Sequence, residues 1–486
     1  MDVVFSAVDA LNVEVDLLAV GITGDGAADL SRTLGAFGHD IAGYLKDRKF
    51  EAKGGASLLV PTFGRAKAKQ LVIVGLGDRG TNDRTLAGAK VGAISRGEKA
   101  ITAAVAFGAL DGATARDVLE LVSVGNYAYD PYLPEAQKRP SLNTLTVLDN
   151  GDGAAIAGAA KAAGVRAAWQ QKARDLVNAP PADIYPESLA AEARKLESIP
   201  HVTVEVWDIK RCEAEGLVGI VAVGQGSARP GVMIRVSYRP PNAKDHVALV
   251  GKGVTFDSGG LSLKPTDGML TMRCDMGGAA TALAATGAIA ELGLAVAVDT
   301  FLPCVENMPS GTSYKLGDIL RYKNGVTVEI QNTDAEGRLI LADALILASE
   351  VPGVSRVVDL ATLTGAILVA LGPDYTGLFT KDQGLADELT GAYAAANEAV
   401  WRLPLVDAYN RLIKGTWGQI KNTGGRNGGS ITAGLFLGYF VKKDTRWAHL
   451  DIAGSAFYDG QVDPYVKGAT GQSVRTLVNW VEKLGA

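Results

Sequence analysis

Apolar and polar positions alternate in short blocks along the first third of the chain. Apolar runs at 17–20, 71–74 and 143–148 have the length of buried strands. Between them, the amphipathic stretches 85–95 and 114–121 are typical of helices. Strands that alternate with helices predict a parallel or mixed sheet with helices on its faces.

A long helix is predicted after this block. A glycine-rich break, Asn150-Gly-Asp-Gly153, precedes an alanine-rich stretch over 154–177. Alanine has the highest helix propensity of all residues, so this stretch favours one continuous helix. The helix must end before Asn178-Ala-Pro-Pro-Ala-Asp183, because proline cannot continue it. We expect this helix to link two domains.

A second, longer α/β pattern follows residue 178. Strands are predicted at 202–207, 219–223, 232–238, 247–250, 295–302 and 357–360, and helices at 277–292 and 341–349. The expected fold class is therefore α/β, with two α/β domains joined by a linker helix. The N-terminal domain covers 1–153, the linker 154–177, and the larger C-terminal domain 178–486, with a mixed central sheet flanked by helices.

The composition is that of a globular chain. Of 486 residues, 47% are hydrophobic and 21% are charged, which excludes a disordered chain. Glycine supplies 59 residues, about 12% against a usual ~7%, which indicates many tight turns. The net charge of −5 argues against nucleic acid or an anionic membrane as the principal partner.

Several features bear on the compartment. The first 31 residues hold six acidic side chains and no lysine or arginine, unlike a secretory or transit peptide. No apolar run reaches the roughly 18 residues that a membrane span needs. The three cysteines, Cys212, Cys274 and Cys304, form no CxxC pair, which fits a reducing compartment. We expect a cytoplasmic protein without a membrane partner.

Two motifs suggest other chemistry. Gly75-Leu-Gly77-Asp-Arg-Gly80 matches the GxGxxG of dinucleotide-binding turns, but no acidic residue ends the next strand about 20 residues on. A nucleotide-binding enzyme is thus one alternative. Asp257-Ser-Gly-Gly260 is similar to the nucleophile segment of chymotrypsin-like serine proteases, although Phe256 stands where that family has glycine. His449 lies among apolar residues and is expected to be buried and structural.

Four carboxylates occur in glycine-rich, turn-like settings within 80 residues, and three cations lie in or near the same motifs. The carboxylates are Asp257, Asp275, Asp334 and Glu336, and the cations are Lys252, Lys264 and Arg338. Asp257 is expected to end an extension of the strand at 247–250. The i, i+2 spacing of Asp334 and Glu336 places both on one side of an extended segment. Each acid alone could instead cap a helix or turn, which is the structural alternative.

The charge of this cluster indicates what it needs. Four carboxylates packed together carry −4, which is costly without compensation. Two divalent cations would supply +4 and leave the lysines and the arginine free for substrate. Oxygen ligands suit Mg²⁺, Mn²⁺ or carboxylate-bound Zn²⁺, and a metal pair about 3.5–4 Å apart serves aminopeptidases and phosphatases alike.

The octapeptide Asn332-Thr-Asp-Ala-Glu-Gly-Arg-Leu339 resembles the signature of the cytosol (leucyl) aminopeptidase family of binuclear metallopeptidases. Other segments match at the same spacing: VGKGVTFDSGGLSLKP at 250–265, ENMPSG at 306–311, DLATLTGA at 359–366 and WAHLDIAG at 447–454. The segment Ser313-Tyr-Lys-Leu-Gly-Asp318 departs from the family, which has a proline there. The resemblance covers the whole second domain. It implies metal-dependent removal of N-terminal amino acids, preferably leucine and other apolar residues.

By this resemblance, each subunit would hold two divalent ions, Mn²⁺ or Zn²⁺. Asp257 and Glu336 would bridge both ions, Asp334 would complete one site, and Lys252 with Asp275 the other. A lysine ligand must be neutral, so the metal and its pocket must depress its pKa strongly. A water that bridges the metals would become a hydroxide near neutral pH.

The resemblance also implies the catalytic groups. Lys264 would polarise the scissile carbonyl and stabilise the gem-diolate. Arg338 would hold a bicarbonate ion that acts as general base, with backbone N–H groups of Ala335, Gly337 and Leu363 completing the anion site.

Substrate selection follows from the same family pattern. The positions that line the side-chain pocket or align the peptide are Met272, Asn332, Thr362, Leu363, Gly365 and Ala453. A pocket floored by Met272 favours Leu or Met, with broad selectivity because methionine is adaptable. A free substrate amine would bind the second metal with help from Asp275, so the substrates are peptides with a free N-terminus.

The expected oligomeric state also rests on the resemblance alone. The family forms hexamers that enclose the active sites, so a homo-hexamer is expected, and the N-terminal domain would serve assembly or regulation. Some relatives bind DNA as architectural factors. The negative charge and the lack of a basic arm make that role the weaker alternative.

Overall fold

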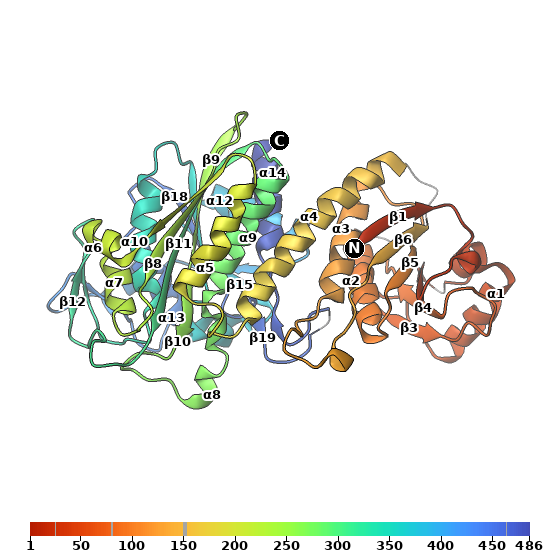
Figure 1. The fold of residues 1–486 in the computed structure, drawn as a ribbon, viewed down its shortest axis with the longest axis horizontal. Coiled ribbons are helices and arrows are strands. Elements are labelled where there is room, and N and C mark those ends of the chain that lie inside the picture. The colour runs from red at the N-terminus through yellow and green to blue at the C-terminus, as the bar shows by residue number, and fades with distance from the viewer. Residues whose placement is uncertain (25, 79–80, 149–152, 463) are drawn as a thin grey trace. The chain divides into compact units, whose positions relative to one another are not determined.

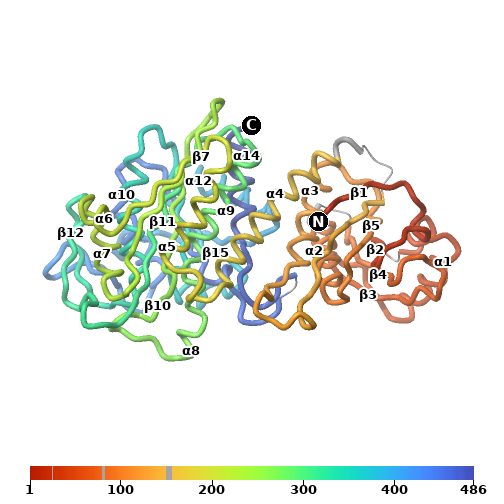
Figure 2. The backbone as a smooth tube through the Cα atoms, in the orientation of Figure 1, coloured from red at the N-terminus to blue at the C-terminus, as the bar shows by residue number. Residues whose placement is uncertain are grey.

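The computed structural model describes residues 1–24, 26–78, 81–148, 153–462 and 464–486. The chain forms two compact units, one of Met1–Gln171 with Gly460–Lys467 and one of Lys172–Asp459 with Gly468–Ala486. Helix α4, Gly153–Asn178, runs across the division in sequence. Both units are α/β, as the alternating pattern predicts (Figures 1 and 2).

The first unit is built on a sheet of order β1-β6-β5-β2-β4-β3, in which only the β3–β4 pair is antiparallel among the described strands. The strands are β1 Asp2–Ser6, β2 Leu17–Ile22, β3 Ser57–Val60, β4 Gln70–Gly75, β5 Thr102–Ala106 and β6 Thr144–Leu148. The helices are α1 Ala27–Asp47, α2 Thr81–Gly97 and α3 Gly112–Asn126. β2 is buried along its whole length, as expected for a central parallel strand covered on both faces.

The second unit is built on a larger mixed sheet of order β16-β15-β18-β14-β9-β11-β8-β7, with β10 paired to β11. Its strands are β7 Val202–Trp207, β8 Val232–Tyr238, β9 Asp245–Gly251, β10 Gly253–Asp257, β11 Val296–Asn307, β14 Arg356–Ala361, β15 Tyr375–Phe379, β16 Ala399–Arg402 and β18 Arg446–Asp451. The central strands β18, β14, β9 and β11 are parallel. Smaller sheets join β12 Ile319–Arg321, β13 Thr327–Glu329 and β17 Ile420–Lys421, and β19 Phe457–Tyr458 with β20 Gly468–Ala469.

Helices cover both faces of this sheet (Figure 1). α9, Gly277–Glu291, packs with α14, Val474–Gly485, on one face. α10, Gly337–Glu350, packs with α7, Val218–Gly224, and α13, Gly429–Gly438, on the other. The remaining helices are α5 Pro186–Arg194, α6 Ile209–Ala214, α8 Thr266–Met269, α11 Gly365–Leu371 and α12 Gln383–Ala395.

The prediction of a strand at 219–223 is wrong, because these residues lie in helix α7. A Cβ at Gly219 would collide with the carbonyl of Leu339, so this glycine lets α7 approach α10 closely. The buried Asp343 carboxylate of α10 also accepts the N–H of Ile220 at 2.8 Å. A short apolar run has the same pattern in a buried helix as in a strand, and here the contacts with α10 decide.

Residues 247–257 also differ from the expected extended strand. β9 ends at Gly251, and a separate strand, β10, begins at Gly253 and pairs with β11. Lys252 lies at the break, and Asp257 ends β10. The site segments thus follow the carboxyl ends of parallel strands, which is where α/β sheets bind ligands. Within the described residues, we find no helix whose length and hydropathy would let it cross a membrane.

Candidate active site

A cavity of about 390 Å³ in the second unit is lined by all of the expected metal-binding, catalytic and substrate-binding residues. They are Lys252, Asp257, Lys264, Met272, Asp275, Asn332, Asp334, Glu336, Arg338, Thr362, Leu363, Gly365 and Ala453. These residues come from segments up to 200 positions apart, so the fold itself assembles them.

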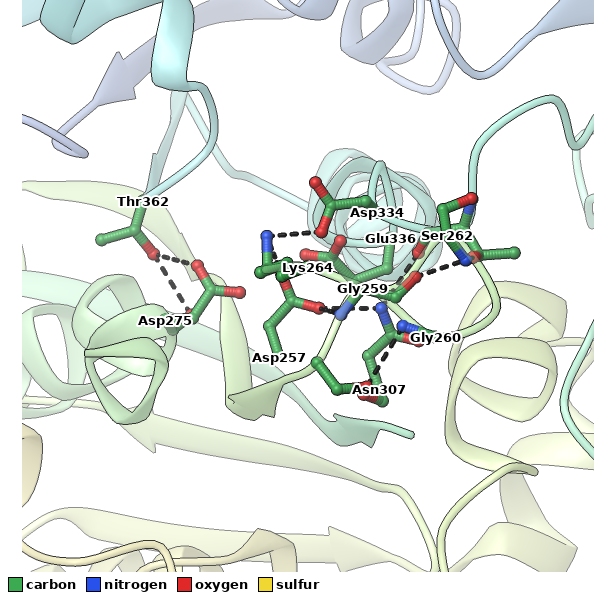
Figure 3. Close-up of polar contacts among 12 residues, drawn as sticks. Asp257, Gly259, Gly260, Ser262, Lys264, Asp275, Asn307, Asp334, Glu336 and Thr362 are labelled. Carbon is green, nitrogen blue, oxygen red and sulfur yellow. Dashed lines mark hydrogen bonds and ion pairs between the residues drawn. The ribbon is translucent and has the colours of Figure 1, made fainter. Parts of the chain in front are cut away.

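Three of the four carboxylates form a tight group. Asp257, Asp334 and Glu336 each offer an oxygen, and these oxygens lie within 4.8 Å of one another (Figure 3). Asp257 ends β10, whereas the other two lie in the loop before α10. Asp257 and Glu336 are buried, and Asp334 is partly exposed toward the cavity. Asp275 lies at the opposite side of the close-up, where the Thr362 hydroxyl donates to its Oδ1 at 2.8 Å.

The Lys252 ammonium joins Asp275 to this group. Its Nζ lies 2.8 Å from Asp275 Oδ1 and 2.9 Å from Glu336 Oε1, and it donates to the Thr362 carbonyl at 2.9 Å. The aliphatic chain of Lys252 crosses the start of α10, where a Cβ on Gly337 would lie 2.6 Å from Nζ. The glycine of the octapeptide is therefore required for Lys252 to reach the acids.

Lys264 forms ion pairs with two members of the acidic group. Its Nζ lies 2.8 Å from Asp257 Oδ2 and forms an ion pair with Asp334. The tight turn after β10 brings it there, with Gly259 at φ +85° and Gly260 at φ +62°, a region that favours glycine. Its side chain is only 17% exposed, so its charge is little screened by water.

Burial controls the electrostatics of the cluster. It raises the pKa of Asp257, and the neighbouring Glu336 charge adds to the effect. Burial also raises the pKa of Asp275 well above its usual value and raises that of Asp334, although the nearby lysines oppose both shifts. Burial lowers the pKa of Lys252, but the charges of Asp275 and Glu336 outweigh it, so this pKa is raised. The cluster carries more negative charge than its lysines neutralise.

The donor set fits divalent cations. Asp275 Oδ2 and Glu336 Oε2 are buried, and neither has a hydrogen-bond partner among the described residues. Buried carboxylate oxygens are costly unless a proton donor or a cation satisfies them. The oxygen donors suit Mn²⁺ or Zn²⁺. The acids favour the charged form of Lys252, contrary to the depressed pKa expected of its pocket, so a bound ion would have to displace that proton before Lys252 could be a ligand.

Arg338 lies at the edge of the cavity and is 8% exposed. Burial lowers the pKa of its guanidinium to about 10, so it remains charged at neutral pH. Its Nε has no hydrogen-bond partner in the described part of the chain, and the guanidinium lies 5.9 Å from the centre of the Phe436 ring. The Leu363 N–H, expected to face an anion, donates instead to the Asp451 carboxylate at 3.2 Å.

The loop that carries Asp334 is held by side chains from distant segments. Asn332 Oδ1 accepts the Asp334 N–H at 2.8 Å. The fully buried Asn422, about 90 residues away, accepts the N–H groups of Gln331 and Asn332 and donates to the Asn332 carbonyl at 2.6 Å. These hydrogen bonds fix the start of the octapeptide backbone.

Comparison with known proteins agrees with this geometry. Residues 171–478 match the catalytic domain of the cytosol aminopeptidase family, and residues 23–135 match its N-terminal domain. The chain belongs to the cytosol aminopeptidase family. It is therefore a hydrolase, a metal-dependent aminopeptidase that acts at peptide N-termini.

Individual relatives support the assignment over nearly the whole chain. A probable cytosol aminopeptidase of Picosynechococcus sp. is 41% identical over 451 residues, covering 91% of this chain and 90% of that protein. One of Streptomyces coelicolor is 38% identical over 512 residues, covering 99% and 98%.

Solved structures agree as well. The bottromycin maturation enzyme BotP in complex with Mn has a TM-score of 0.84 at 37% identity, covering 97% of this chain and 100% of that one. A mutant of tomato leucine aminopeptidase has a TM-score of 0.88 at 33% identity, covering 99% and 96%.

The cavity of this aminopeptidase also has lining residues that the sequence did not put forward. They are Cys274, Thr364, Leu368, Thr423, Gly425, Gly429 and Thr432. The segment Thr423-Gly-Gly425 lies in a glycine-rich turn ahead of a helix, the same setting as the carboxylates. This setting could have identified Thr423 and Gly425 as candidate lining residues from the sequence.

The competing motifs take structural roles in the aminopeptidase. His449 is fully buried, as expected, with Nδ1 2.6 Å from Asp359 Oδ1, and the Ser258 hydroxyl donates to the Asn307 carbonyl. In the glycine motif at 75–80, Arg79 and Gly80 lie outside the described residues. The Asp83 carboxylate accepts the Asp78 N–H within that turn, so a bound phosphate would meet a like charge.

Proposed function

We propose that this aminopeptidase removes leucine and other apolar residues from peptides with a free N-terminus. Two divalent ions, Mn²⁺ or Zn²⁺, would be held by Lys252, Asp257, Asp275, Asp334 and Glu336. The family resemblance implies that Asp257 and Glu336 would each serve both ions. Such ions supply a nucleophilic water at neutral pH and polarise the carbonyl.

Lys264 and Arg338 are the proposed catalytic groups of the chain itself. Lys264 keeps its proton, because the charge of Asp257 outweighs the effect of burial and raises its pKa. It would donate a hydrogen bond to the developing oxyanion. Arg338 would hold bicarbonate as general base, since its guanidinium is charged, buried and only partly satisfied.

The substrate would lie along the remaining lining residues. Met272, Thr362, Gly365 and Ala453 would enclose the first side chain, while Asn332 and Leu363 would align the peptide. Asp275 is buried in the cavity and would help to bind the free α-amine at the second ion by accepting a hydrogen bond from it. The nitrogen lone pair of an acylated amine is delocalised into the acyl carbonyl, so such an amine is a poor metal ligand, and endopeptidase activity is disfavoured.

The single observation that carries this proposal is the convergence of the carboxylates and both lysines in one cavity of about 390 Å³. The test compares hydrolysis of leucine amide with that of its N-acetylated twin, after chelator treatment and with or without added Mn²⁺. We expect cleavage of the free amine alone, and only with metal restored. No cleavage of either substrate under any metal would reject the proposed site.

Assembly and location are also part of the proposal. We infer a cytoplasmic homo-hexamer, with the first unit serving assembly or regulation. Support comes from the family membership and from relatives whose name is cytosol aminopeptidase. Size-exclusion chromatography with light scattering should give six times the 50.5 kDa chain mass.

A further inference from the structure

Asn307 is a buried polar residue beside the carboxylate cluster that has no role in the function proposed above. It ends β11 and pairs in register with Asp257, the last residue of β10. Its side chain is fully buried. A buried amide costs free energy unless its polar atoms find partners, so its contacts indicate why it is there.

The amide of Asn307 links two segments of the site (Figure 3). Nδ2 donates to Asp257 Oδ1 at 2.8 Å and to the Thr333 carbonyl at 2.9 Å. These two acceptors fix the orientation of the amide, because the flipped form would turn its oxygen toward a carboxylate and a carbonyl. One side chain therefore ties the end of β10 to the loop that carries Asp334 and Glu336.

Asn307 also determines which oxygen of Asp257 faces the cavity. Oδ1 accepts two hydrogen bonds, from Asn307 and from the Gly259 N–H at 2.8 Å. Oδ2 lies 2.8 Å from Lys264 Nζ, on the side of the acidic group. Without the amide, the Asp257 carboxylate would lose one of the two donors to its Oδ1.

We propose that Asn307 is a positioning residue for the metal centre. It fixes the rotation of the Asp257 carboxylate and the distance of this group from the loop at 331–336. This inference rests on the proposed role of Asp257 as a metal ligand. Partners that orient a ligand typically contribute roughly 10- to 100-fold to metal affinity or activity.

Tyr314 provides a matched control in the same place. Its hydroxyl donates to the same Thr333 carbonyl at 2.7 Å, and its ring is buried. Among the described residues, this hydroxyl makes no hydrogen bond to a carboxylate. Tyr314→Phe therefore loosens the loop without releasing Asp257.

The experiment titrates chelator-treated full-length protein with Mn²⁺ and measures free Mn²⁺ by electron paramagnetic resonance. Asn307→Leu removes both donors at similar volume, and Asn307→Asp removes them at equal shape while adding charge. We expect the Mn²⁺ dissociation constant to rise roughly 10- to 100-fold in both. Tyr314→Phe should raise it much less. The Mn²⁺ concentration for half-maximal hydrolysis should shift in parallel, while KM for leucine amide at saturating Mn²⁺ stays close to wild type.

Melting temperatures in chelator separate positioning from stability. The proposal is overturned if the Asn307→Leu protein binds Mn²⁺ as tightly as wild type. It is also overturned if Asn307→Leu and Tyr314→Phe have equal melting temperatures and Asn307→Leu binds Mn²⁺ no more weakly. If Asn307→Leu does not fold, Asn307→Ser keeps one donor without added bulk and takes its place in the same comparison. A wild-type chain that binds neither Mn²⁺ nor Zn²⁺ overturns the proposed function as well, whereas equal Mn²⁺ binding by wild type and variants overturns this inference alone.

Discussion

The residues of the site depend on one another through direct contact. Gly337 has no room for a side chain because Lys252 passes over it, and Lys252 in turn reaches both Asp275 and Glu336. Thr362 was expected only to line the substrate pocket or align the peptide, but its hydroxyl also donates a hydrogen bond to the Asp275 carboxylate. A single substitution here therefore disturbs a network, and its effect depends on which carboxylate it releases.

Asp334→Ala should abolish metal-dependent hydrolysis while leaving the fold intact. The lost carboxylate is a proposed ligand, so we expect a fall beyond the roughly 100-fold typical of outer partners. Burial raises the pKa of Asp334 and its removal relieves repulsion, so the melting temperature in chelator should not fall. Kinetics, metal analysis and thermal melting test this. Asp267→Ala, at an exposed carboxylate in α8, is the control. A fully active Asp334→Ala protein with a full complement of metal would contradict the assignment of Asp334 as a metal ligand.

Arg338→Ala should slow turnover by about 100-fold or more, the contribution expected of a general base. Any stimulation of the rate by bicarbonate should disappear, while Mn²⁺ content stays near wild type. Arg338→Lys keeps the charge but loses the planar fork, and should recover only part of the rate. Steady-state kinetics across bicarbonate concentrations would detect these differences. Unchanged turnover in Arg338→Ala would remove Arg338 from the mechanism.

The charged residues of this site could be predicted from the sequence, whereas two of its neutral polar residues could not. Acids and lysines such as Asp257 and Lys264 stand out in glycine-rich turns, because an unpaired charge there needs an explanation. The amides of Asn307 and Asn422 carry no such signal, since asparagine is common in turns. Their roles depend on segments that only the fold brings together.

At the scale of elements, strong periodicity and length decided what could be predicted. The strands β7 and β8 have the predicted bounds, and α9 and α10 differ from theirs only at the ends. The helix α7 was predicted as a strand because its apolar run is short. Helix α1 was not predicted from the sequence, and Gly35 interrupts it at φ +55°. Glycine inside a helix lowers its propensity and weakens the sequence signal.

Asp16 ties three strands of the first unit and should make its stability sensitive to acid. It accepts the N–H groups of Ile101 and Thr102, and its pair with Lys69 chiefly lowers its pKa to about 2. A depressed pKa stabilises the fold above the unfolded value of 3.8, and this contribution is lost as the pH falls toward 2. Wild type should therefore exceed Asp16→Asn in unfolding free energy at pH 5, and the difference should shrink toward pH 2.5. Urea unfolding at both pH values measures it. A difference that does not change with pH would contradict the argument.

At the scale of the whole molecule, the alternation of strands and helices correctly predicts two α/β units. The sequence gives no sign that Gly460–Lys467 groups with the first unit while its flanking residues belong to the second. Membership of so short a segment depends on tertiary contacts and not on local pattern. The same holds for the strand order of the larger sheet, in which β15 and β16 lie outside β18.

Metal binding should stabilise the folded chain, because the proposed ligands converge only when the second unit is folded. At a free Mn²⁺ concentration of about 100 times the dissociation constant, the unfolding free energy should rise by about 2.7 kcal/mol for each ion bound. Denaturant unfolding with Mn²⁺ and with chelator measures this rise. Asp334→Ala should lose most of it. An equal rise in that variant would mean that Mn²⁺ stabilises the protein elsewhere.

The position of Asn422 has a consequence for synthesis on the ribosome. The octapeptide is translated about 90 residues before the asparagine that holds its backbone, and β18, which completes the parallel core, ends only at Asp451. A nascent chain that has just released Asp334 and Glu336 from the exit tunnel still lacks these supports. We therefore expect an unfinished chain to be inactive as a peptidase until Asn422 and β18 have been synthesised.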